Sequence, residues 1–238
     1  MNNETNMTKT QVFNVIILDK SGSMEHIRRA AVEGFNEILA GIRKAQERYA
    51  DTQEHYVTLL TFCDCERQYV FDRVPVAEAR PLTMEDYQPC CCTPLYDAMG
   101  FTLTAMRNHV RRYIDAVVLA TIITDGLENS SREYTCNTVR QLVEELKNEG
   151  WTFTFMGANQ NSLEEAFSLS IRNARDFDYS HSGTMDGMEK ECCARTNFFS
   201  RLDKFKRDVY SSIDLSADER RERYIAMADN AFDEEEGK

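Results

Sequence analysis

Three polar residues at alternate positions follow an apolar run near the N-terminus. The segment VIILDKSGSMEH, residues 15–26, places Asp19, Ser21 and Ser23 after four branched apolar residues, with Gly22 between the serines. This spacing lets a tight loop point three side chains in one direction, and glycine allows the chain to bend. Their oxygens suit hard cations such as Mg²⁺ or Mn²⁺ better than Zn²⁺. The simpler alternative is helix capping, for which serine is well suited.

Two later residues have the same chemical character. Thr93 stands directly before Pro94 and a segment with helical spacing, and Asp125, in TIITDGLEN, follows the longest apolar run of the chain. Capping could account for Ser23 or Thr93 taken singly. It does not explain why Asp19 and Asp125 both stand where an apolar run ends, so we expect all five residues to form a metal site.

The remaining sequence predicts the elements that must position these residues. Short apolar runs alternate with segments of helical period. The predicted strands cover residues 13–18, 56–62, 67–71, 116–123, 151–156 and 176–179. The predicted helices cover residues 27–47, a segment from 94 to about 110, 136–148, 162–169 and 185–205.

This alternation, with one hairpin at 56–71, predicts an α/β fold. We expect a doubly wound, mostly parallel six-stranded sheet with one antiparallel edge strand and helices on both faces. Ligands of such sheets bind at the carboxyl ends of the strands, where the strand order reverses. Asp19 and Asp125 are predicted to lie at that edge.

The ordered residues resemble a known family. Residues 10–206 are similar to a von Willebrand factor type A (VWA) domain of the stand-alone bacterial kind, whose metal-ion-dependent adhesion site is D-x-S-x-S, then Thr, then Asp. The chain has all five members in order: Asp19, Ser21, Ser23, Thr93 and Asp125. The resemblance implies direct metal binding by the two serines and often the threonine, with both aspartates acting largely through water. It also implies a metal position that a carboxylate of a partner protein fills.

Neighbouring residues have less specific patterns. His26 and Glu128 are candidates for the rim of the ligand site, although each could be an ordinary exposed residue. We expect Asp97 to be structural, because an acid in the first turn of a helix is favoured by the helix dipole.

An enzyme is the main alternative to a binding module. Haloacid-dehalogenase-type phosphatases also place an aspartate at the end of a strand, but their D-x-D motif supplies a second aspartate as general acid. Ser21 occupies that second position here, and no motif for another chemistry is present. We therefore expect a metal-dependent protein-binding module and no enzyme. An Mg²⁺-dependent phosphatase-like hydrolase is the alternative, and a scaffold with a vestigial site is disfavoured by the intact motif.

Composition limits the remaining possibilities. The 238 residues carry a net charge of -12, which disfavours nucleic acid and anionic membranes as partners. The N-terminus is polar and no apolar run is long enough to cross a membrane, so we expect a cytoplasmic protein. We expect residues 1–10 to be poorly ordered, 11–206 to form the domain, and 207–238 to be an extension. That extension should hold a helix opened by a capping box at Ser216 and Glu219, and then an acidic tail.

Eight cysteines form unusual clusters, Cys63-x-Cys65, Cys90-Cys91-Cys92, Cys136 and Cys192-Cys193. Adjacent cysteines are poorly placed to bridge one another, and the spacing is not that of a typical zinc site. We expect free, partly buried thiols. Residues before the threonine of the resembled motif are commonly small, so three cysteines there could alter the loop or make the site redox-sensitive.

Overall fold

The computed structural model describes residues 8–158, 160–211, 216, 219 and 222–228. Its centre is a six-stranded sheet in the order β3-β2-β1-β4-β5-β6. Only the β2–β3 pair is antiparallel among these neighbours, which confirms the predicted fold class. The strands are β1 (Thr10–Asp19), β2 (Gln53–Cys63), β3 (Glu66–Pro75), β4 (Ala116–Thr124), β5 (Thr152–Gly157) and β6 (Ala174–Asp176).

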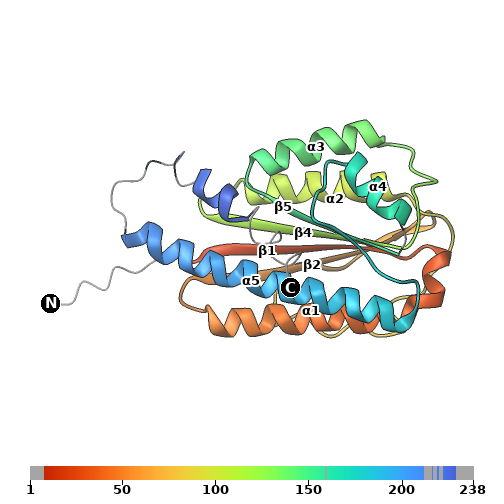
Figure 1. Cartoon of the computed structure of the whole chain (residues 1–238), viewed down its shortest axis with the longest axis horizontal. Helices are drawn as coiled ribbons and strands as arrows, with labels where there is room; N and C mark the ends of the chain where they lie inside the picture. The colour runs from red at the N-terminus through yellow and green to blue at the C-terminus, as the bar shows by residue number, and fades with distance from the viewer. Residues whose placement is uncertain (1–7, 159, 212–215, 217–218, 220–221, 229–238) are drawn as a thin grey trace.

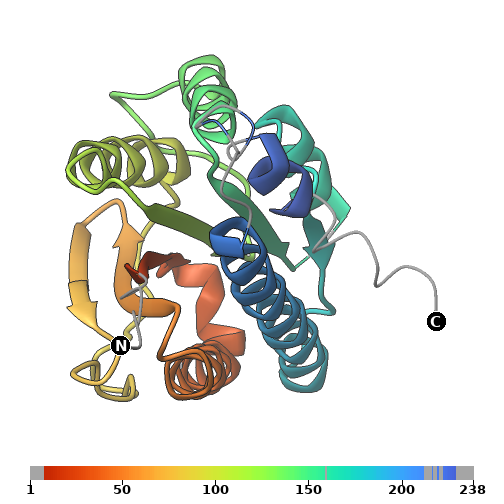
Figure 2. The same ribbon diagram turned by 90° about the vertical axis from the view of Figure 1, so that its left-hand side faces the viewer.

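Helices cover both faces of the sheet. Figure 1 shows α2, α3 and α4 on one face and α1 and α5 on the other, and Figure 2 shows the same layers from the end. The helices are η1 (Gly22–Ile27, a 3-10 helix), α1 (Arg28–Arg48), α2 (Leu95–Val110), α3 (Cys136–Asn148), α4 (Gln160–Ser168) and α5 (His181–Ser211).

The predicted elements differ from the structure mainly at their ends. The bounds of α3 agree at both ends, and Gly150 follows it with a φ of +90° that favours glycine. The predicted strand at 176–179 is wrong in position, because β6 covers 174–176. Helix α5 begins before the predicted start and continues to Ser211, since a sparse apolar pattern gives no clear end.

Alternate residues of β1 build the two halves of the core. Val12, Ile16 and Leu18 pack on the side of α1 and α5, whereas Phe13 and its neighbours Val15 and Ile17 pack on the side of α2 and α3. All six are at most 1% exposed. A strand covered on both faces reads as a continuous apolar run, which is why the sequence located it well.

A buried polar group attaches α5 to the sheet. Arg195 and Glu191 of α5 form an ion pair of 3.2 Å, and their side chains are 2% and 1% exposed. Asn14 of β1 accepts a hydrogen bond from Arg195, and Thr154 of β5 donates one to Glu191. These contacts fix the helix relative to the strands, and with it the connection from β6 that passes the carboxyl edge of the sheet.

The described part of the C-terminal segment packs near the start of β5, away from the carboxyl ends of the strands. Ser216 and Glu219 make the reciprocal hydrogen bonds of the predicted capping box. Tyr224 contacts Phe205 of α5, with 6.0 Å between ring centroids, and lies against Gly150 before β5. Residues 1–7 and the acidic tail within 229–238 lie outside the described residues.

Candidate metal centre

The five predicted site residues lie at the carboxyl edge of the sheet. Strand β1 pairs with β2 on one side and β4 on the other, so the strand order reverses between β1 and β4. Asp19 ends β1, and Asp125 directly follows β4. This is the position at which open α/β sheets bind ligands.

Asp19 is fully buried and its hydrogen-bond partners are uncharged. Its Oδ1 accepts the Ser21 amide at 2.7 Å, and its Oδ2 accepts the Thr124 hydroxyl at 2.6 Å. Burial raises the pKa of Asp19 to about 6, although the bonds from Thr124 and Ser21 oppose the shift. An ionised carboxylate in this environment is costly unless a cation balances it.

The two serines connect this carboxylate to Asp125. The Ser21 and Ser23 hydroxyl oxygens lie 3.2 Å apart, and Ser23 donates to Asp125 Oδ1 at 2.8 Å. Burial also raises the pKa of Asp125, while hydrogen bonds from Ser23 and Tyr179 oppose the rise. The carboxylates thus accept hydrogen bonds from the hydroxyl groups on one side. The lone pairs of the hydroxyl oxygens remain for another ligand.

Thr93 reaches the same point from the segment before α2. Its amide donates to Asn129 Oδ1 at 2.9 Å, and its carbonyl accepts the Asn129 amide at 3.1 Å. A Cβ added at Gly126 would stand 3.4 Å from Thr93 Oγ1 and 3.7 Å from Ser23 Oγ. The two hydroxyls therefore border one small space, which glycine leaves open.

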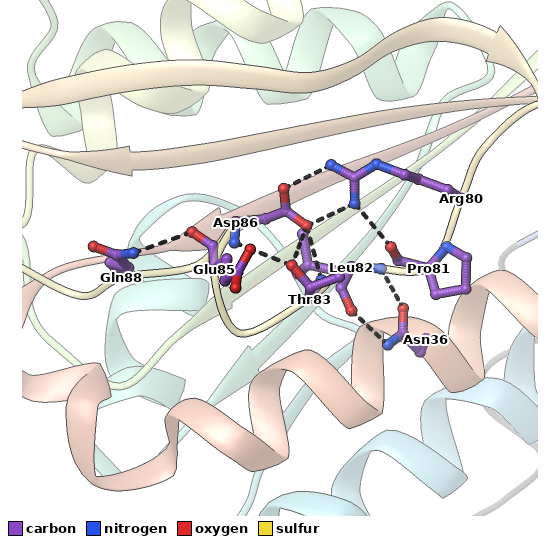
Figure 3. Close-up of polar contacts among 8 residues, drawn as sticks. All are labelled: Asn36, Arg80, Pro81, Leu82, Thr83, Glu85, Asp86 and Gln88. Carbon is purple, nitrogen blue, oxygen red and sulfur yellow. Dashed lines mark hydrogen bonds and ion pairs between the residues drawn. The ribbon is translucent and has the colours of Figure 1, made fainter.

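A long connection between β3 and α2 carries Thr93 to the site, and its polar contacts hold it to α1 (Figure 3). Arg80 binds Asp86 with two bonds of 2.6 Å. Asn36 of α1 exchanges two bonds with the backbone of Leu82, at 3.0 and 2.7 Å. The Tyr87 hydroxyl, fully buried, donates to the carbonyl oxygen of Asp19. The connection is thereby held both to α1 and to the residue that ends β1.

The cysteines differ from the prediction. Cys65 and Cys91 form a disulfide, and both residues are exposed, so the expectation of free, partly buried thiols is wrong for this pair. Cys91 does not bridge to an adjacent cysteine; its partner is 26 residues earlier, in the β2–β3 turn. The expectation of a free thiol holds for Cys63, Cys90, Cys92, Cys136, Cys192 and Cys193.

The rim contains a residue that the sequence did not indicate. Tyr179, from the connection between β6 and α5, donates its hydroxyl hydrogen bond to the carbonyl of Ser23 and is 40% exposed. Its ring packs edge-on against His26, with 5.9 Å between centroids. Burial raises the pKa of Tyr179, and Asp125 adds to the effect. The predicted rim residue His26 is exposed beside it.

Two other acids near the site organise loops. Glu128 accepts the amides of Tyr96, Ser130 and Ser131 at 2.6 to 2.9 Å, so its carboxylate holds the loop after β4 against α2. Asp97 accepts three amides from residues 132–134, as expected of a structural acid. Both shape the surroundings of the centre through the backbone.

The donor set fits a hard divalent cation. Three neutral hydroxyls, of Ser21, Ser23 and Thr93, are backed by two buried carboxylates, and every donor is an oxygen. Mg²⁺ and Mn²⁺ prefer such ligands, whereas zinc prefers nitrogen and sulfur. A cation at the hydroxyl oxygens would also stabilise the ionised form of both buried carboxylates.

Comparisons with known proteins identify the fold. No protein-family model and no curated sequence matches the chain. Among solved structures, it is similar to the pilus adhesin SpaC from Lactobacillus rhamnosus GG, with a TM-score of 0.60 and 14% identity over 81% of this chain and 31% of SpaC. The SpRpn10 VWA domain has a TM-score of 0.50 and 12% identity, over 75% of this chain and 94% of that domain.

Proximal thread matrix protein 1 from the mussel byssus is also similar, with a TM-score of 0.50 and 14% identity over 77% of this chain. The alignment spans less than half of that protein, 45% of its length. At such identities the likeness concerns the fold alone: the chain has an α/β fold of the VWA type. In the described part of the chain, none of the helices combines the length and apolar character needed to cross a bilayer.

Proposed function

We propose that the protein is a metal-dependent protein-binding module. A divalent cation, Mg²⁺ or Mn²⁺, is held by the hydroxyls of Ser21, Ser23 and Thr93, with Asp19 and Asp125 behind them. The cation supplies a positive charge that binds a carboxylate of a partner protein. The observation that carries the proposal is the pair of buried aspartates behind converging hydroxyl oxygens.

The charge distribution supports a carboxylate ligand. A chain with a net charge of -12 repels an acidic partner at long range. A cation only partly neutralised by its protein ligands reverses this locally, because charge interactions in a crevice exceed their value in bulk water. With a cation bound, the partner's Asp or Glu side chain would be its ligand, and exposed Tyr179 and His26 would supply contacts at the rim.

The geometry of Asp19 supports binding over phosphoryl transfer. A nucleophilic carboxylate needs an accessible oxygen, but both oxygens of Asp19 accept hydrogen bonds and the residue is fully buried. Ser21 occupies the position at which haloacid-dehalogenase-type phosphatases have their general acid. Such an acid increases the rate by a factor of about 10² to 10⁴. We expect a screen of phosphate esters with Mg²⁺ to give no turnover above background. Turnover by the wild type that Asp19→Asn abolishes would instead support the alternative function, a phosphatase-like hydrolase.

Calorimetric titration with Mn²⁺ tests the site directly. Wild type is expected to bind one Mn²⁺, and the double variant Asp19→Ala with Ser21→Ala is expected to bind none. Glu47→Gln removes a negative charge from an exposed position on α1 and serves as the control. Equal binding by wild type and the double variant would contradict the assignment.

The partner is tested by affinity capture in Mn²⁺ and in EDTA. Proteins retained in Mn²⁺ by wild type should be released by EDTA and should not be retained by Ser21→Ala. A purified partner that binds with unchanged affinity in EDTA would show that the cation is not the contact.

A further inference from the structure

Four cysteine sulfurs meet beside the candidate metal centre. Cys63 ends β2, Cys65 lies in the β2–β3 turn, and Cys90 and Cys91 come from the segment before Thr93. Cys65 and Cys91 are bonded, and the Cys63 and Cys90 sulfurs lie 3.0 Å apart. The sulfurs of Cys65, Cys90 and Cys91 all lie within 4.8 Å of one another. A disulfide and two thiols thus form one contact group.

The disulfide is open to solvent. Cys65 and Cys91 are both exposed, whereas Cys63 is 3% exposed. Cys63 and Cys65 line a recess of about 370 Å³ between the β2–β3 turn and the start of α2. Exposed disulfides are the ones that exchange readily, because an attacking thiolate must reach a sulfur atom.

The same segment is bonded to the loop that carries the serines. The Cys90 amide donates to the Lys20 carbonyl at 2.8 Å, and the Gly22 amide donates to the Cys91 carbonyl at 3.0 Å. Cys91 has a φ of 59°, in the left-handed region that residues other than glycine adopt only at a cost. Its surroundings, the disulfide among them, must hold that conformation. Thr93 is only two residues further on.

We propose that Cys65–Cys91 is a reversible thiol–disulfide site whose state sets the position of Thr93. The reaction partner is a protein dithiol. One of its thiolates attacks Cys65 Sγ, forms a mixed disulfide and releases Cys91 as a thiolate, which takes up a proton. The second thiol then attacks the mixed disulfide and releases Cys65. Two electrons pass to the chain, and the dithiol leaves as a disulfide.

Reduction removes the covalent link between the β2–β3 turn and the Thr93 segment. Cys91 can then leave the left-handed conformation, and the hydrogen bond from Gly22 to its carbonyl is lost with it. With Thr93 and the serine loop no longer held together in this way, cation binding is expected to weaken. This expected weakening rests on the proposed function. The disulfide chemistry itself does not, so the two are measured separately.

The first measurement counts thiols. The purified full chain is equilibrated in glutathione buffers from fully oxidised to fully reduced, alkylated, and analysed by peptide mass spectrometry. Cys65 and Cys91 are expected to become labelled together as the buffer is made reducing, and to lose the label together on reoxidation. Thioredoxin, as a protein dithiol, should accelerate the change. Labelling of both cysteines in every buffer, or in none, would overturn the proposal.

A zinc content assay accompanies the labelling. If the reduced chain holds one zinc ion, and Cys63, Cys65, Cys90 and Cys91 resist alkylation until a chelator is added, the cluster is a zinc site and the proposal is wrong. Absence of bound zinc supports the thiol–disulfide site.

The second measurement compares Mn²⁺ affinity of the two forms. Reduced wild type should bind Mn²⁺ about fivefold or more weakly than oxidised wild type, a typical size for coupling between neighbouring sites. Cys65→Ser should match the reduced form in any buffer. Cys92→Ser, an exposed free cysteine of the same segment, should behave as wild type. Circular dichroism checks that both variants fold.

The outcomes separate the two hypotheses. Equal Mn²⁺ affinity in both forms would overturn the coupling to Thr93. Absence of Mn²⁺ binding in both forms would overturn the proposed function and the coupling with it, while reversible labelling of Cys65 and Cys91 would still establish the disulfide site.

Discussion

The two halves of the candidate centre are built differently. Asp19 and Asp125 stand at the ends of adjacent parallel strands, whose register fixes both positions. Thr93 ends a connection of irregular structure that is held by side-chain contacts and one disulfide. The aspartate half is therefore as rigid as the sheet, and the threonine half is as rigid as its individual contacts. Any regulation of cation binding is therefore expected to act on the position of Thr93.

Loss of the disulfide should have the largest effect on stability. The bond joins residues that are 26 positions apart, for which the chain-entropy model gives about 3.5 kcal/mol. Urea unfolding of oxidised protein should show this loss of unfolding free energy in Cys65→Ser and none in Cys92→Ser. A loss below about 1 kcal/mol would mean that the hydrogen bonds alone hold the threonine half.

Asp19 should make the stability of the metal-free protein depend on pH. Its folded-state pKa is raised from 3.8 to about 6, so the folded state binds more protons and loses stability as pH rises between these values. The loss corresponds to about 3 kcal/mol. Urea unfolding in EDTA should show Asp19→Asn more stable than wild type by about this amount at pH 7, with the gap closing towards pH 4.

The comparison of Asp19→Asn with wild type also tests whether the buried carboxylate is prepared for a cation. Mn²⁺ should reverse the order of stability at pH 7, because the cation favours the ionised carboxylate that asparagine lacks. If Asp19→Asn is less stable than wild type even in EDTA, the buried carboxylate is not a site prepared for a cation.

Mn²⁺ affinity should fall by different factors in variants of the aspartate half and of the threonine half. We expect Asp19→Asn to weaken binding about 100-fold, because residues that orient metal ligands contribute up to that factor. Thr93→Ala should weaken it about tenfold, or about 1.4 kcal/mol, since two hydroxyl ligands remain. Calorimetry measures both, with Glu47→Gln as control. An effect of Thr93→Ala larger than that of Asp19→Asn would contradict the proposed division.

The smallest effect is expected from the polar contacts of the long connection. Asp86→Asn weakens the pairing with Arg80, which is half exposed, so the unfolding free energy should fall by at most about 1 kcal/mol. The same change should weaken Mn²⁺ binding slightly in the reduced protein and not in the oxidised one. Equal effects in both states would show that the disulfide does not share in holding this connection.

Local sequence patterns were sufficient to predict the sheet, most of the helices and the location of the aspartates. Strand β1 is covered on both faces and α3 has a clear amphipathic period, so local patterns suffice for both. Because parallel strands end at one edge, Asp19 and Asp125 could be placed together before any contact was known. Sparse patterns limited the prediction at β6 and α5.

Contacts between segments far apart in the sequence complete the site, and local patterns do not predict them. Tyr179 reaches Ser23 across 156 positions, Tyr87 reaches Asp19 across 68, and Cys65 reaches Cys91 across 26. None of these residues has a periodic pattern or a motif that names its partner. Cysteine spacing in particular gives no pairing, because a disulfide depends on the distance between two segments in space. The packing of the loops at the carboxyl edge sets that distance.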